Sequence, residues 1–231
     1  YELSQSKTTV GSTKATSVTG EEGKTRLRSS LKYILSKDTR DSRFDPTEGY
    51  YLEMDETLAG FGGDAKFLRT KLSAAYYKPL LFKSVILGAS GKLGYVTGLG
   101  DKVTQSQRFN LGGRDVRGFG SGGIGPRDTG SSDAVGGNKM YAGSFEAVSS
   151  LGFDKDTGVR WTVFTDFGSL WGSDYPSGVT QANAADMRVS AGVGIFWTTA
   201  IGPLSFSWAK PLSKMAHDSA KTFQFNIGTR L

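Results

Sequence analysis

The residues best suited to a specific polar interaction lie in one glycine-rich stretch, residues 108–120, which reads RFNLGGRDVRGFG. Arg117 and Phe119 flank Gly118 there, surrounded mostly by glycine, aspartate and asparagine. A guanidinium group offers a rigid fork of N–H donors that matches a carboxylate, and a phenylalanine ring favours apolar packing. The stretch therefore predicts a loop that docks against another part of the chain. A solvated loop cation is the alternative for Arg117 taken alone.

A carboxylate suited to this role lies on a strand-like segment in the second half of the chain. Trp161 and Val163 alternate there with polar residues, and Asp166 and Gly168 fall on the opposite face from them. Phe164 shares that polar face and offers a ring against which a loop can pack. A glycine on the same face leaves room for another backbone to approach closely.

The sequence offers few residues suited to catalysis, metal binding or phosphate binding. The chain has no cysteine, and its single histidine, His217, lies between lysines near the C-terminus. Asp38, Asp41 and Asp45 are close in sequence, but their spacing is not that of an EF-hand, so we interpret them as turn acids. Glycine-rich residues 120–123 are not followed by the Lys-Ser/Thr pair of a phosphate-binding loop. We therefore expect neither an enzyme nor a bound metal or other cofactor.

The elements that must position these side chains are strands. Most of the chain alternates apolar and polar residues with a period of two, most clearly in residues 188–197, where only Phe196 interrupts the pattern. The expected strands are residues 25–40, 49–61, 66–79, 83–99, 138–153, 158–171, 186–200, 203–211 and 221–231, with a less clear one near the N-terminus. The predicted fold class is all-β and antiparallel, with about nine to ten strands.

Strand length favours a membrane-spanning sheet. Several segments exceed the about 5–6 residues of a usual soluble strand and match the roughly 9–11 needed to cross a bilayer at a tilt. Aromatic residues gather near the segment ends, as in the girdles of outer-membrane barrels. The mean hydropathy of −0.30 does not contradict this, because alternating strands dilute the apolar signal. A soluble β-sandwich, which also alternates, is the alternative.

The connections between the expected strands differ in length. Residues 45–49, 154–158 and 201–203 are short turn clusters, and Pro79 indicates another brief break. Residues 101–137 and 172–185 are long by comparison. Short turns at one end and long loops at the other are typical of outer-membrane barrels.

Four motifs resemble the BamA-type outer-membrane protein assembly family, within the superfamily that also includes two-partner-secretion transporters. They are Gly112-Gly113 with Val116-Arg117-Gly118-Phe119 and Ile124-Gly125-Pro126, then residues 164–171 (FTDFGSLW), 202–211 (GPLSFSWAKP) and 223–228 (FQFNIG). The resemblance covers nearly the whole chain. It implies the C-terminal portion of a sixteen-stranded transmembrane β-barrel over residues 1–231, with loop 101–137 folded into the interior.

The resemblance also assigns roles to particular residues. Val116, Arg117, Gly118 and Phe119 are the implied loop motif, and Asp166 with Gly168 forms its implied partner on the interior wall. Gly118 then permits a tight turn, and Phe119 anchors the loop tip.

The last expected strand is the second implied functional element. Residues 221–231, with Phe223, Phe225, Ile227 and Gly228, correspond to the closing strand of the family, which pairs with the first strand at a lateral gate. Gly228 has no side chain and weakens the strand near its end. The simpler interpretation of the three apolar residues, that they face lipid, is compatible with this role.

The implied function is the insertion and folding of β-barrel proteins in the bacterial outer membrane. The expected partners are unfolded outer-membrane proteins, recognised through their C-terminal strand, together with accessory assembly lipoproteins and outer-membrane lipid. Nucleic acid is not expected, because the net charge of +6 is dispersed along the chain. A two-partner-secretion transporter is the alternative function, followed by a passive outer-membrane channel.

Two departures from the family pattern stand out in the sequence. No POTRA domains precede the barrel segment, so we expect the chain to be part of a longer protein. The chain ends in Leu231, whereas the family pattern ends in an aromatic residue.

Overall fold

The computed structural model describes residues 2–7, 25–80, 84–150, 157–174, 178–180, 185–199 and 202–228. Ten antiparallel strands of this part form one sheet, in the order β1-β2-β3-β4-β5-β8-β9-β11-β12-β14. The strands are β1 Glu2–Lys7, β2 Thr25–Asp38, β3 Gly49–Gly63, β4 Phe67–Leu80, β5 Val85–Gly98, β8 Lys139–Ser149, β9 Val159–Trp171, β11 Arg188–Thr199, β12 Gly202–Ser213 and β14 Phe223–Ile227. The all-β antiparallel architecture expected from the sequence is confirmed.

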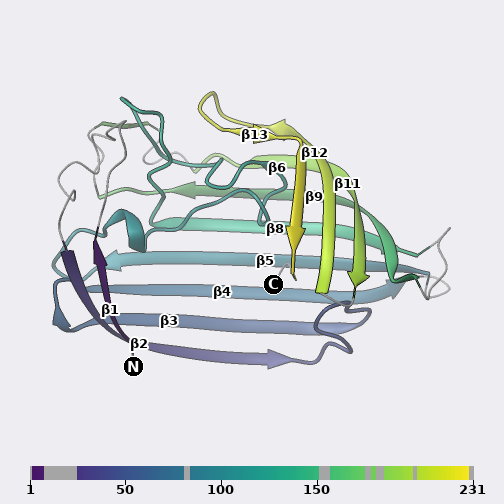
Figure 1. Cartoon of the computed structure of the whole chain (residues 1–231), viewed down its shortest axis with the longest axis horizontal. Coiled ribbons are helices and arrows are strands. Elements are labelled where there is room, and N and C mark those ends of the chain that lie inside the picture. Colours follow the sequence, from purple (N-terminus) through teal and green to yellow (C-terminus); the bar gives the residue numbers. More distant parts are fainter. Residues whose placement is uncertain are drawn as a thin grey trace.

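The sheet curls strongly from one edge to the other (Figure 1). Strands β3, β4, β5 and β8 run side by side, whereas β11, β12 and β14 turn across in front of them. The connection between β5 and β8 folds back over the strands instead of extending away from them. It contains the short helix η3 (Gln105–Gln107) and the two-residue strands β6 (Gly118–Phe119) and β7 (Arg127–Asp128).

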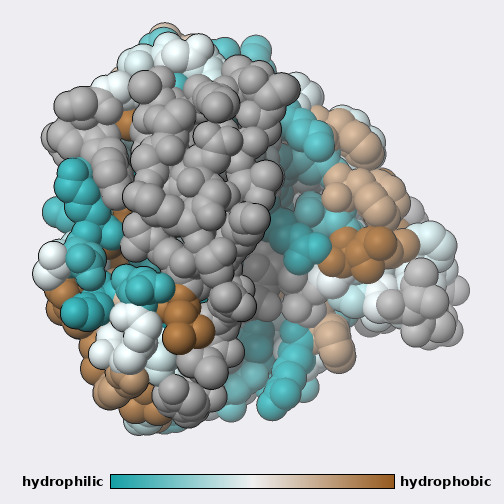
Figure 2. Space-filling view, turned by 60° about the vertical axis from the view of Figure 1, so that its left-hand side comes forward, coloured by the Kyte–Doolittle hydropathy of each residue, from teal (hydrophilic) through white to brown (hydrophobic). Residues whose placement is uncertain are grey.

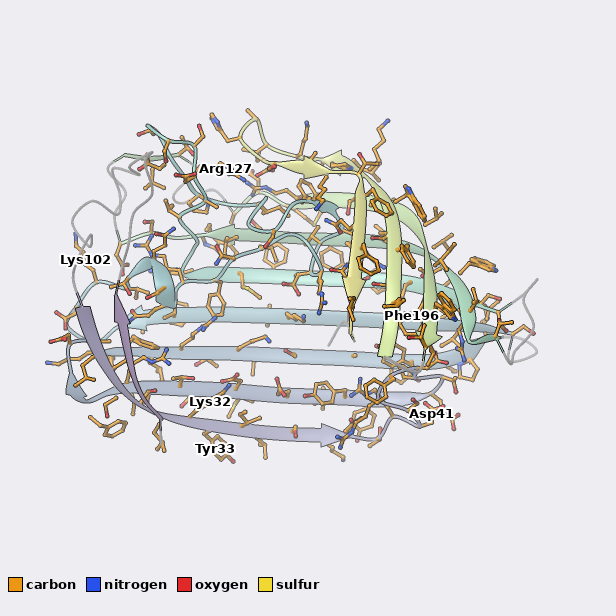
Figure 3. All side chains as sticks on the ribbon, viewed as in Figure 1. Lys32, Tyr33, Asp41, Lys102, Arg127 and Phe196 are labelled. Atoms are coloured by element: carbon orange, nitrogen blue, oxygen red, sulfur yellow. The ribbon has the colours of Figure 1, made fainter. Side chains whose placement is uncertain are left out.

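The two faces of the sheet differ in exposure as the alternation predicts. In β9, Val163 is exposed while Phe164 and Asp166 are buried, and in β2 the neighbours Lys32 and Tyr33 point to opposite sides (Figure 3). The exposed large apolar side chains include Leu72, Leu93, Tyr95, Phe145, Val163, Val193, Trp197, Trp208, Phe223 and Phe225. Figure 2 shows brown hydrophobic side chains along the lower left flank of the molecule. The outer face is therefore apolar, as lipid contact requires, whereas the inner face carries buried polar groups such as Asp166 beside buried rings such as Phe164.

Several expected element boundaries are wrong. Pro79 does not break a strand but lies in β4 opposite Ile86 of β5. Strand β3 pairs with β4 only as far as Tyr77, so Pro79 has one neighbouring strand and its missing N–H breaks no second ladder. Pro203 is the second residue of β12, where a proline is also tolerated. The expected turn residues 154–156 and 201 lie outside the described residues.

The expected last strand, residues 221–231, is divided in the structure. Lys221 belongs to β13 (Ala220–Lys221), which pairs with β6 of the long loop and not with the main sheet. Gly228 follows the end of β14 and has a φ of +97°, a backbone conformation that favours glycine. The glycine therefore ends the strand instead of loosening its interior, and Leu231 lies outside the described residues.

The long loops contact one another at the end of the sheet opposite the short turns. Strand β10 (Val179–Thr180) pairs with β7 of the first long loop. The Asp174 carboxylate accepts hydrogen bonds from the Val103 backbone N–H at 2.6 Å and from the Asn138 side chain at 2.9 Å. In the residues that the structure describes, no helix is long and apolar enough to cross a membrane.

The exposure pattern predicts which side chains contact lipid. Leu93 lies near the middle of β5 and is 55% exposed. Leu93→Lys in the full-length protein should destabilise the membrane-inserted state by about 2–4 kcal/mol, the cost of a lysine on the lipid face near the bilayer midplane. Urea unfolding in lipid vesicles measures this effect, with Leu93→Met as the apolar control. Equal stability of the two variants would show that this face does not meet lipid.

Candidate functional site

The long loop builds much of its own core against the inner face of the sheet. Buried apolar residues of the loop and of the sheet form one continuous cluster that includes Val103, Phe109, Leu111, Val116, Phe119 and Ile124 from the loop and Phe67, Val96, Met140, Ala142 and Leu170 from the strands. Val116 and Phe119 are both completely buried. Burying a phenylalanine fully stabilises a fold by about 1.5–3 kcal/mol, so the loop is held by packing as well as by polar contacts.

Arg117 and Asp166 meet at the centre of this interface. The Arg117 Nε donates to Asp166 Oδ2 at 2.7 Å, and Nη2 donates to Oδ1 at 2.8 Å, which makes a bidentate pair. The Arg117 backbone N–H also donates to Oδ2, at 2.9 Å. Asp166 is 0% exposed and Arg117 is 8% exposed. Water therefore competes little for either group.

Side chains of strands β8 and β9 provide the remaining contacts of Arg117 and Asp166. The Ser144 hydroxyl of β8 donates to Asp166 Oδ1 at 2.6 Å, and Arg117 Nη2 also contacts the Ser144 oxygen at 3.2 Å. Glu146 Oε2 lies 3.5 Å from Arg117 Nη2, at the outer limit of a hydrogen bond. The guanidinium carbon lies 3.2 Å from the centroid of the Phe164 ring, so the arginine stacks on an aromatic face as well.

Two glycines allow the loop to approach this closely. A Cβ added at Gly168 would lie 2.8 Å from the Tyr141 carbonyl oxygen and 3.1 Å from Val116 Cγ2. Gly118 has a φ of +89°, and a Cβ there would lie 3.2 Å from the Ser190 Cβ. Gly168 therefore excludes a side chain, and Gly118 needs a backbone conformation that other residues rarely adopt.

The loop tip also holds the last strand of the sheet. The Gln224 side-chain amide of β14 donates to the Phe119 carbonyl, and β13 pairs with β6 through Ala220–Phe119 and Lys221–Gly118. Arg114 donates from Nε to Asn226 Oδ1 at 3.1 Å and from Nη2 to the Ile227 carbonyl. The same loop that binds Asp166 on β9 thus contacts β14 along its inner face.

The predicted closing-strand residues occupy the outer side of β14. Phe223, Phe225 and Ile227 are exposed, and Phe223 and Phe225 pack their rings on Trp208 and Phe206 of β12 at centroid distances of 5.1 and 5.0 Å. In the part of the chain that the structure describes, β14 pairs with β12 and with no other strand. Its second edge therefore presents backbone groups for pairing with another strand.

Sequence reasoning found Arg117, Asp166 and the two glycines but missed other residues of the site. Ser144, Gln224 and Arg114 all bind across the interface, and their positions in the sequence give no local signal. For Gln224, the sequence indicates only a polar residue on the inner face of an alternating strand. A second buried ion pair, Arg188 Nε to Asp218 Oδ2 at 3.0 Å, was also missed.

A curled antiparallel sheet with an apolar exterior, and with a long loop bound to its polar interior, defines a segment of an outer-membrane β-barrel. The Omp85 superfamily domain matches residues 1–231, and the chain belongs to this family. The family match covers both the loop motif and the closing strand.

The chain is similar to assembly proteins of bacteria and eukaryotes. It is 32% identical over 204 residues to the outer membrane protein assembly factor BamA of Neorickettsia risticii, which covers 88% of this chain and 27% of that protein. It is 31% identical over 217 residues to the sorting and assembly machinery component 50 homolog of Homo sapiens, covering 88% of this chain and 46% of that protein. The chain thus spans less than half the length of these relatives.

A solved structure with the same fold agrees with these similarities. The crystal structure of BamA from Haemophilus ducreyi lacking POTRA domains 1–3 matches with a TM-score of 0.80 and 29% sequence identity. The match covers 89% of this chain and 43% of that chain.

The buried pair predicts a strong effect of removing its negative charge. Asp166→Asn in the full-length protein should destabilise loop docking by about 3–5 kcal/mol, because a buried guanidinium loses its carboxylate. Trypsin should then cleave the loop faster, as followed by gel electrophoresis of the protein in vesicles. Glu146→Gln is the matched control, since its contact with Arg117 is longer and the expected effect is below about 1 kcal/mol. Equal cleavage rates in both variants would contradict a dominant role for Asp166.

Proposed function

We propose that this chain is the later part of a sixteen-stranded barrel in the bacterial outer membrane and that the complete protein folds and inserts other β-barrel proteins there. The two relatives described above carry names that refer to assembly, which favours assembly over secretion or passive transport. The observation on which the proposal rests is that the inner loop holds β14, the last strand of the described sheet, through Gln224, Arg114 and the β13–β6 pair.

The edge of β14 suits a templating role. An unpaired strand edge binds an extended segment through backbone N–H and C=O groups, and alternate side-chain positions supply specificity. In the complete barrel this edge would pair with the first strand, and separation of the two strands would form a lateral gate into the membrane. An unfolded outer-membrane protein would then add its C-terminal strand at the gate.

The remaining partners follow from the same proposal. Outer-membrane lipid would contact the exposed apolar face formed by residues such as Leu93 and Phe145. Accessory assembly lipoproteins would bind the parts of the protein outside the membrane. The role is not enzymatic, because strand pairing and insertion into the bilayer release free energy without a chemical step.

A reversible crosslink tests the gate. The chain contains no cysteine, so a cysteine placed at Ile227 is the only one in this segment. A second cysteine in the first barrel strand of the full-length protein completes the pair. The oxidised protein should lose assembly of a barrel substrate into vesicles, and a reductant should restore it. Each single-cysteine variant is the control for the substitutions themselves. Full activity of the oxidised protein would rule out opening at this seam.

The loop pair supplies a second test of function. Arg117→Ala in the full-length protein should lower the rate of substrate assembly at least severalfold, because the loop that holds β14 is no longer anchored at Asp166. The variant barrel should still reach the membrane, as its outer face is unchanged. Lys102→Ala, at an exposed position of the same loop, is the control. If the Arg117 variant assembled the substrate at the normal rate, docking of the loop would not be required for function.

A further inference from the structure

The outer face of the sheet carries a carboxylate in the middle of a strand. Glu56 is the central residue of the 15-residue strand β3. It falls on the same side of the strand as Leu52 and Leu58, which are exposed, and on the opposite side from Ala59, which is buried. Glu56 therefore points outward, together with the side chains that the exposure pattern assigns to lipid contact.

The neighbouring strands surround this carboxylate with apolar side chains. The sheet register places Glu56 opposite Tyr33 of β2 and opposite Thr70 of β4. Tyr33 points outward (Figure 3) and is 55% exposed. The nearest outward positions before and after this row on the three strands are all apolar: Leu31, Leu35, Met54, Leu58, Leu68 and Leu72. Glu56 is therefore a single charge within an apolar area.

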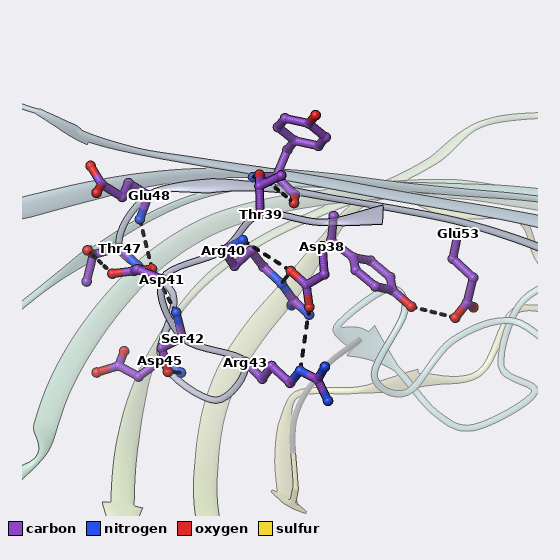
Figure 4. A network of polar contacts seen from close by, with 12 residues as sticks. Asp38, Thr39, Arg40, Asp41, Ser42, Arg43, Asp45, Thr47, Glu48 and Glu53 are labelled. Atoms are coloured by element: carbon purple, nitrogen blue, oxygen red, sulfur yellow. Dashed lines mark hydrogen bonds and ion pairs between the residues drawn. The ribbon is translucent and has the colours of Figure 1, made fainter. Parts of the chain in front are cut away.

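The inward carboxylates of the same strand have partners within the chain, and Glu56 does not. Asp55 pairs with Lys32 of β2 at 2.9 Å. Glu53 accepts a hydrogen bond from the Tyr51 hydroxyl (Figure 4). Among the residues that the structure describes, no hydrogen bond or ion pair involves Glu56. The negative charge at this position therefore has no role in holding the described sheet together.

Lysines on the outer face occupy different places from Glu56. Lys37 is the second-last residue of β2 and lies over the Tyr50 ring, and Lys139 is the first residue of β8 and lies over the Tyr95 ring. A long side chain near a strand end can extend its ammonium group to the membrane surface. The shorter side chain of Glu56, in the middle of its strand, has no such route. An ionisable group that faces lipid at depth is unfavourable, and this indicates a specific role.

The position of Glu56 along β3 decides which kind of partner reaches it. From the middle of the strand to either end is roughly 24 Å, at about 3.4 Å per residue. A strand tilt of about 40° reduces this to roughly 18 Å along the membrane normal, which is more than half of the about 25 Å apolar band of such barrels. Lipid headgroups lie at the edges of that band. A cation that meets Glu56 must therefore come from a protein segment within the membrane.

We propose that the outer surface formed by Glu56, Leu31, Tyr33, Leu35 and Leu72 binds a membrane-spanning segment of another protein that presents one lysine or arginine to the Glu56 carboxylate. Opposite charges attract strongly away from water, and the leucines pack against the apolar remainder of the segment. A second copy of this chain does not suit the surface, because a symmetric interface would bring two Glu56 carboxylates together. Strand β3 is seven positions from β14 in the sheet order. The surface is therefore separate from the strand edge of the assembly proposal and does not rest on it.

Binding of a synthetic membrane-spanning peptide to the full-length protein in phosphatidylcholine vesicles tests the proposal. The probe is a dye-labelled helix of leucine and alanine with one central lysine, and the comparison peptide has methionine in its place. Energy transfer to a second dye on Lys78→Cys, near the end of β4, measures binding. The lysine peptide should bind at least about tenfold more tightly than the methionine peptide, because one ion pair forms away from water.

Two variants of β3 identify the residue responsible. Glu56→Gln should remove the preference for the lysine peptide. Glu53→Gln makes the same change on the inward side of the same strand, so it should keep the preference, and circular dichroism checks that both variants are folded. Equal affinity for the two peptides, or a preference that persists in Glu56→Gln, would overturn the proposal. A preference that disappears in phosphatidylethanolamine vesicles would assign Glu56 to an amine headgroup and would also overturn it.

Stability without any partner supplies a second measurement. Glu56→Leu should raise the urea midpoint of the full-length protein in vesicles, because the variant no longer exposes a carboxylate to lipid. A wild-type protein that gives up this stability retains Glu56 for an interaction outside its own barrel. A lower midpoint for Glu56→Leu would show that the carboxylate supports the barrel itself, and this result would overturn the proposal.

Discussion

The bidentate pair between Arg117 and Asp166 is the interaction on which the interior of this sheet depends. A guanidinium and a carboxylate withdrawn from water are stable only when their geometry is good and their other donors and acceptors are satisfied. Ser144 and the Phe164 ring provide this completion, and the Arg117 backbone N–H adds a further hydrogen bond. Since loss of either partner leaves an uncompensated buried charge, the pair fixes one loop position among the many that a glycine-rich chain can adopt.

From that fixed point, the loop connects the middle of the sheet to its edge. Asp166 is on β9, two strands away from β12 and three from β14 in the sheet order. Two residues beyond Arg117, the Phe119 carbonyl accepts from Gln224 of β14, while Arg114 binds the end of the same strand. A shift of the loop therefore changes the support of β14 directly, through a continuous set of hydrogen bonds, and this gives the proposed gate a physical control on its inner side.

The two ends of the strands have different properties. Long loops pack on one another at one end, through Asp174, Val103 and the β7–β10 pair. At the other end, the turn between β2 and β3 and the inner residue Phe196 border a cavity beside β14. The described residues therefore fill the interior of the sheet at the loop end and leave a cavity at the turn end, lined by arginines, carboxylates and aromatic rings.

The sequence by itself determined the strands, because alternation is a local property of each segment and successive side chains of a strand point to opposite faces. It also placed Asp166 and Gly168 on the inner face, and the motif resemblance paired Asp166 with Arg117. The tertiary structure alone decided that Gln224 binds the Phe119 carbonyl and that Arg114 binds Asn226. It also decided that Pro79 fits within β4 and that Gly228 ends β14. These contacts join residues more than 100 positions apart, or depend on where a neighbouring strand stops. They follow from how the sheet curls, which alternation within single strands does not specify.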